Sequence, residues 1–123
     1  LRGGWRVGLG SDVAGGHTLD LFAVMASAVQ VSKLRWRYVD QTEAPLTMVE
    51  ALYLATVGGG DFWRDYGVQL GLFEPGYALD ALVLNDSALR NQRDFTPAER
   101  LERYAYLGKG SLTAKFVDGK QIF

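Results

Sequence analysis

Residues 18–32 constrain the fold most strongly, because they predict a helix that is apolar around almost its whole circumference. Thr18 is a plausible N-cap, and the polar residues Asp20, Ser27 and Gln30 form only a narrow stripe on the helix. Such a helix needs apolar cover on most of its sides. With 123 residues the chain has room for one domain, which can hardly supply that cover. We therefore expect this helix to belong to a larger assembly.

Caps and turns predict the remaining elements. The chain should begin with a strand that places Trp5 in the core. A capping box at Thr47-x-x-Glu50 should start a later helix, which we expect to stop at the glycines that follow it. In chain order we predict a buried strand at 5–9 and helices at 18–32 and 47–57, the second of which stops at 58–60. A turn at Pro75–Gly76 and a strand at 79–84 follow. The chain then continues with a helix from Thr96 to Gly108, which starts with a second capping box, and a hairpin around Asp118–Gly119. Residues 33–38 are expected to form a solvated loop. The order of elements indicates an α/β chain.

Composition excludes several classes of function. Thirteen basic and 14 acidic residues give a formal net charge of -1, so we expect neither nucleic acid nor an anionic membrane as a partner. The chain has no cysteine and a single histidine, His17, so a self-contained zinc site is improbable. No apolar run reaches the roughly 18 residues that span a bilayer. The absence of cysteine favours a reducing compartment, and we expect a cytoplasmic location.

Asp12 is the candidate functional residue, because it lies in a glycine-dense loop directly after the strand at 5–9. In α/β folds the loop after the carboxyl end of a strand is where chemistry takes place. A carboxylate there could bind a metal ion, accept a proton from metal-bound water, or cap the following helix; the turn preferences of Asp favour the cap. A phosphate-binding loop matches poorly, because Val13 stands where a third glycine would be needed and no lysine follows. We expect His17 to have a capping or packing role.

The segment at residues 10–16 (GSDVAGG) is similar to the one after the last barrel strand of the guanine deaminases, in the metal-dependent amidohydrolase superfamily, and residues 55–59 (ATVGG) resemble the "ATxGG" end of a helix in the same superfamily. Residues 72–84 (LFEPGYALDALVL) are similar to the superfamily's "G-x-hydrophobic-E-x-G-x-x-A-D-hydrophobic" signature, with Leu79 where alanine is usual. The segments 106–108 and 116–120 resemble guanine deaminase tails. The resemblance covers essentially the whole chain.

The resemblance implies a zinc enzyme built on a (β/α)8 barrel, in which Asp12 is both a metal ligand and the catalytic proton shuttle. It implies guanine as the purine base substrate, with xanthine and ammonia as products; another deaminase or chlorohydrolase of the superfamily is the alternative. The His-x-His pair of the family is missing from this sequence. We therefore expect a C-terminal fragment, inactive and free of zinc on its own. Residues 1–69 would form the last strand-loop-helix unit of the barrel and the helices after it, and residues 70–123 the C-terminal strands and helix of a small β-sandwich domain.

A hypothesis of a different class is that these residues form a non-catalytic module that self-associates. The apolar helix at 18–32 and a β domain without partner strands would leave apolar surface and sheet edges exposed, which invites pairing with another copy. We therefore expect a homo-oligomer.

Overall fold

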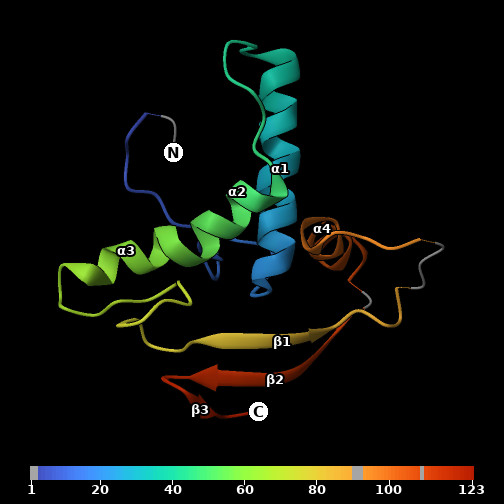
Figure 1. The fold of residues 1–123 in the computed structure, drawn as a ribbon. Helices are drawn as coiled ribbons and strands as arrows, with labels where there is room; N and C mark the ends of the chain where they lie inside the picture. The colour runs from blue at the N-terminus through green and yellow to red at the C-terminus, as the bar shows by residue number, and fades with distance from the viewer. Residues whose placement is uncertain (1–2, 90–92, 109) are drawn as a thin grey trace.

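The computed structural model describes residues 3–89, 93–108 and 110–123. The helices are α1 (Leu21–Tyr38), α2 (Met48–Tyr53), α3 (Gly59–Arg64) and α4 (Pro97–Leu107), and the π-helical turn η1 (Leu54–Gly58) joins α2 to α3. The strands are β1 (Ala81–Asn85), β2 (Ser111–Val117) and β3 (Lys120–Gln121). The long helix α1 stands at the centre of the helical part, with α2 and α4 beside it (Figure 1). Within the described ranges, none of the helices combines the length and apolar character needed to cross a bilayer.

Helix α1 is displaced and longer than the sequence predicts. The N-cap is Asp20, whose carboxylate accepts a 2.9 Å hydrogen bond from the Phe22 amide, while the Thr18 hydroxyl accepts one from the Asp20 amide. The predicted N-cap at Thr18 and the predicted end at residue 32 are therefore wrong. The helix continues to Tyr38 because residues 33–38 contain neither proline nor glycine, and Arg35 and Arg37 suit its negative C-terminal end.

The core lies where α1, α2 and α4 meet. Its buried side chains are small or flexible, which lets the helices approach closely: Met25, Ala26, Val29, Met48, Ala51 and Ala105. The ring of Phe22 packs edge-on against Tyr104, with centroids 4.9 Å apart. Other apolar side chains of α1 face away from this core, since Val31 is 63% and Leu34 57% exposed. Within the described residues, α1 is covered on part of its circumference only.

Helix α2 begins as predicted but does not stop at the glycines. Its capping box is complete, with the Thr47 hydroxyl accepting from the Glu50 amide and the Glu50 carboxylate accepting from the Thr47 amide. The chain then passes through η1 into α3 without leaving helical backbone angles, with φ of -61° at Gly58 and -68° at Gly59. The predicted stop at 58–60 is wrong, because glycine ends a helix when it adopts a positive φ.

The C-terminal part forms a three-stranded antiparallel sheet in the order β1-β2-β3. Asp118 and Gly119 both have positive φ, 48° and 74°, as a two-residue hairpin turn requires, so the predicted hairpin is confirmed. Gly76 has a φ of 95°, and the Tyr77 amide donates to the Glu74 carbonyl, which confirms the predicted turn. The helix after the second capping box is also confirmed, and it ends at Gly108 with a φ of 58°.

The predicted strand at residues 5–9 is not a strand in this structure. The segment is extended, but among the described residues no strand lies beside it, and its Leu9 amide donates to the Leu54 carbonyl at 3.0 Å. A strand is defined by a ladder of hydrogen bonds with a neighbour, and sequence alternation alone does not supply that neighbour. The side chain of Trp5 is 80% exposed, so its predicted place in the core is wrong as well.

Candidate functional site

Asp12 lies in a tight turn at the end of the extended segment. Its backbone φ is 48°, and its carbonyl accepts hydrogen bonds from the amides of both Gly15 and Gly16. The carboxylate folds over Gly15, where a Cβ atom would come within 2.6 Å of Oδ2. The side chain is exposed, and among the described residues no hydrogen bond or ion pair holds the carboxylate. The turn thus presents a carboxylate whose oxygens can accept a proton or bind a ligand.

The backbone of this turn explains the glycine-rich sequence around Asp12. A Cβ atom at Gly16 would overlap the carbonyl oxygen of Ser11, so only glycine fits there. Ala14 adopts a φ of 77°, a left-handed conformation that costs a residue with a Cβ about 1–2 kcal/mol. Asp12 itself is a residue type that tolerates a positive φ. Backbone strain of this kind clusters at functional sites, which makes the turn at Asp12 a candidate.

The structure overturns two alternatives for this loop. Asp12 does not cap the following helix, since Asp20 occupies that position. The same Asp20 carboxylate satisfies the Phe22 amide at the positive end of α1, so a phosphate there would meet a negative charge. His17, for which we predict a capping or packing role, contacts helix α1 through its side chain, with Nε2 3.4 Å from the Ser27 hydroxyl.

Close approaches to glycine hold the extended segment against the helices. Gly8 lies on Gly59, and a Cβ at Gly8 would be 2.9 Å from the Gly59 Cα. A Cβ at Gly58 would overlap the Val7 carbonyl oxygen. With the hydrogen bond from Leu9 to Leu54, these contacts fix the segment three to five residues before Asp12. The glycines that the sequence assigns to a helix stop therefore serve as a contact surface.

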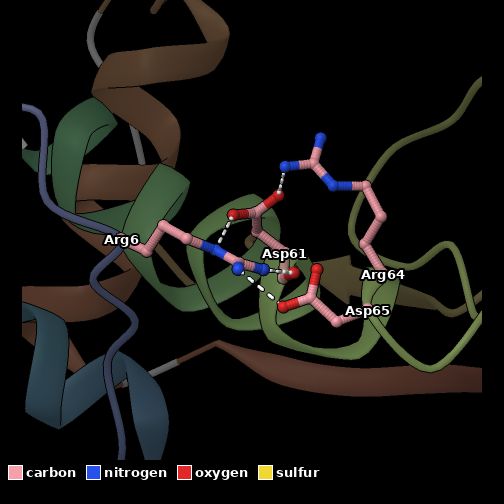
Figure 2. A network of polar contacts seen from close by, with 4 residues as sticks. All are labelled: Arg6, Asp61, Arg64 and Asp65. Atoms are coloured by element: carbon pink, nitrogen blue, oxygen red, sulfur yellow. Dashed lines mark hydrogen bonds and ion pairs between the residues drawn. The ribbon is translucent and has the colours of Figure 1, made fainter.

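A charged network, missed by the sequence analysis, ties the start of the same segment to α3. Figure 2 shows the guanidinium of Arg6 between the carboxylates of Asp61 and Asp65, with Nε 2.6 Å from Asp61 Oδ2 and an Nη nitrogen 2.7 Å from Asp65 Oδ2. Arg6 also donates to the backbone carbonyl of Asp61, and Arg64 pairs with the other oxygen of the Asp61 carboxylate. The hydrogen bond and positive charge of Arg6 lower the pKa of Asp65, and the two aspartates raise the pKa of Arg6.

These residues do not form a zinc site by themselves. Zinc in proteins needs three or four ligands from histidine, cysteine or carboxylate side chains. Among the residues that the structure describes, no group of three such side chains lies close enough together to hold a metal ion. Asp12 could supply one ligand of a zinc site, and the remaining ligands would have to come from elsewhere.

Comparison with known proteins decides the family. The model of the amidohydrolase family matches residues 1–122. The chain belongs to the amidohydrolase family. Its fold is similar to the crystal structure of guanine deaminase from C. acetobutylicum with guanine bound in the active site, with a TM-score of 0.83 and 44% identity over 95% of this chain and 27% of that one. The predicted resemblance to guanine deaminases is confirmed.

Two curated relatives show how far the similarity extends. Human guanine deaminase is 30% identical over 95% of this chain and 27% of its own length. A 5-methylthioadenosine/S-adenosylhomocysteine deaminase of Nitratidesulfovibrio vulgaris is 37% identical over 82% of this chain and 22% of its own length. The chain thus spans about a quarter of the length of these two relatives.

Proposed function

We propose that this chain serves in the hydrolytic deamination of guanine to xanthine and ammonia, as part of a zinc-dependent amidohydrolase. The observation that carries the proposal is the similarity, at 44% identity and a TM-score of 0.83, to a guanine deaminase with guanine in its active site. Similarity to guanine deaminases from organisms as distant as human and Dictyostelium discoideum supports the same substrate.

We infer that Asp12 is the catalytic residue of this chain and one ligand of the zinc ion. Hydrolytic deamination forms a carbon–oxygen bond from water at the ring carbon that bears the amino group, and breaks the carbon–nitrogen bond to release ammonia. The proton that water loses must reach the departing nitrogen. An exposed carboxylate without a structural partner can accept that proton and pass it on. The Asp12 carboxylate is not needed to cap α1, because Asp20 is the N-cap, and this favours a catalytic role for Asp12.

The proposal includes three further predictions. Residues 1–69 would form the last strand-loop-helix unit of the barrel and the helices after it, and residues 70–123 the C-terminal strands and helix of a small β-sandwich domain, whose helix α4 packs against α1 and α2 of the first part. The exposed apolar side chains of α1 favour a homo-oligomer or cover by further chain. The cysteine-free composition favours a cytoplasmic location.

One observation favours a second candidate within the same chemistry. The Nitratidesulfovibrio vulgaris relative, named as a deaminase of 5-methylthioadenosine and S-adenosylhomocysteine, is 37% identical over 82% of this chain. Deamination of an adenine ring uses the same proton transfer at a different ring carbon, so the Asp12 loop suits either base. Residues that distinguish guanine from adenine would have to contact the ring edge.

The test is ammonia release by the complete protein in which this chain occurs, with guanine and 5-methylthioadenosine offered separately. We expect turnover of guanine, and Asp12→Asn should lower it by about 10²–10⁴-fold, the usual effect of removing a general base. Asp118→Asn is a matched control, since Asp118 is also exposed and has the same φ of 48°. Its turnover and melting temperature should stay unchanged. Turnover of 5-methylthioadenosine alone would refute the substrate, and an Asp12→Asn enzyme retaining more than about a tenth of the activity would refute the role of Asp12.

A further inference from the structure

We propose that Arg6 is a positioning residue, which fixes the segment leading to Asp12 onto α3 through the carboxylates of Asp61 and Asp65. The inference rests on the proposed role of Asp12 and adds a residue on which that role depends.

The geometry of the network suits a clamp. The two carboxylates and the Asp61 carbonyl all receive hydrogen bonds from one planar guanidinium, and the two bonds to side chains measure 2.6 and 2.7 Å (Figure 2). The rigid fork of arginine fixes direction as well as distance, which a lysine ammonium does not. Arg64 holds the far oxygen of Asp61 and so orients the acceptor.

The clamp adds a side-chain contact to the backbone contacts that hold the segment. Among the described residues no strand flanks it, and its backbone is held at Val7, Gly8 and Leu9. Arg6 provides the side-chain contact that precedes them. Asp12 lies six positions after Arg6, about 20 Å if the chain is fully extended, so a change in the direction of the segment at Arg6 displaces the loop at its end.

The consequence should fall on catalysis more than on stability. The Arg6 side chain is 50% and that of Asp65 63% exposed, and exposed ion pairs contribute little to folding. Catalytic groups, by contrast, depend on position: a displacement of about 1 Å can cost on the order of 100-fold in rate. Loss of the clamp should therefore lower kcat while the protein stays folded.

The experiment uses the complete protein with four variants: Arg6→Ala, Arg6→Lys, Asp65→Asn and the double variant Arg6→Ala/Asp65→Asn. The control is Arg35→Ala, which removes an ion pair of similar length and exposure, 2.8 Å to Asp40 with Arg35 55% exposed, on a different element. Two quantities are measured for each variant: kcat and KM for guanine, and the hydrogen-exchange rate of the Leu9 amide, whose bond to Leu54 reports the position of the segment.

We expect Arg6→Ala to lower kcat by about 10- to 100-fold with KM within about twofold, and to speed Leu9 exchange. Arg6→Lys should recover part of both. The double variant should be no worse than Arg6→Ala, since both substitutions remove one shared interaction. Arg35→Ala should leave both quantities unchanged. Unchanged Leu9 exchange in Arg6→Ala overturns the clamp, and faster exchange with unchanged kcat overturns its role in catalysis.

Failure of the proposed function gives a different result. If the unaltered protein does not release ammonia from guanine, the substrate is wrong, and the Leu9 exchange rates still decide whether Arg6 fixes the segment. Faster exchange in Arg6→Ala but not in Arg35→Ala then supports the clamp, and equal rates overturn it.

Discussion

Gly58→Ala should destabilise the protein, whereas Gly59→Ala should stabilise it, although the two glycines are neighbours in the same helical path. Both have right-handed helical angles, with φ of -61° and -68°, so alanine fits the backbone equally well at either. A Cβ at Gly58 would lie well under 3.0 Å from the Val7 carbonyl oxygen, whereas at Gly59 the nearest atom, the Leu54 carbonyl oxygen, is 3.9 Å away. The difference in stability between the two variants therefore measures the contact between the helix at Gly58 and the extended segment at Val7.

The magnitude follows from two opposing contributions. Replacing glycine by alanine inside a helix stabilises it by about 1 kcal/mol. At Gly58 the Val7 carbonyl would have to retreat by about 1 Å to restore an ordinary carbon–oxygen contact of about 3.3 Å. Overpacking of this kind costs about 1–3 kcal/mol. Gly59→Ala should thus gain about 1 kcal/mol, and Gly58→Ala should fall about 1–3 kcal/mol below it.

Urea unfolding of the complete protein, followed by circular dichroism, measures both variants against the unaltered protein. Equal slopes with different midpoints would place the effect in the free energy of unfolding. If the two variants agree within about 0.5 kcal/mol, the extended segment does not lie against Gly58 as described, and the reasoning is refuted.

Three further predictions concern the two residues of the second capping box and zinc. Thr96→Ala should cost about 1 kcal/mol of unfolding free energy and Thr96→Ser almost nothing, as chemical denaturation can show, because the hydroxyl caps α4. Hydrogen bonds from the Thr96 amide, then from Arg93, lower the pKa of Glu99 from 4.5 to about 2. Its contribution to stability is therefore complete above pH 4.5 and lost as the pH falls towards 2, and Glu99→Gln should flatten the acid titration of stability over that window. The 123 residues alone should retain no zinc after dialysis, because one carboxylate makes a weak site; elemental analysis finding one zinc per chain would contradict this.

Local chemistry made part of the fold predictable. The two capping boxes and the Asp118–Gly119 hairpin were predicted correctly because each capping box, and the pair Val117–Lys120 that closes the hairpin turn, joins residues three positions apart. The same holds for the Pro75–Gly76 turn. Such features depend on side-chain reach and on φ, and both can be read from a few neighbouring residues.

The wrong predictions at residues 5–9 and 58–60 depended on contacts between distant residues, whereas the wrong ends of the helix predicted at 18–32 were local errors. Alternation at residues 5–9 predicts a strand, but a strand needs a neighbour, which the sequence of the segment does not specify. Arg6 gave no signal either, because Asp61 and Asp65 lie 55 and 59 positions away. Asp12 is a candidate because of its place in a loop and the family resemblance, and the sequence alone does not indicate that Asp20, rather than Asp12, caps the following helix.

The structure also joins two motifs that are far apart in the sequence. The GSDVAGG segment contains Asp12, and the ATVGG segment contains Gly58, more than 40 positions later. The carbonyl of Val7 packs against Gly58, and the Leu9 amide donates a hydrogen bond to the carbonyl of Leu54, just before ATVGG. The glycines of the second motif thus determine how closely the segment before Asp12 can approach the helix. A side chain at Gly58 and the loss of Arg6 should therefore disturb the same structural unit, one by pushing the segment away and the other by releasing it.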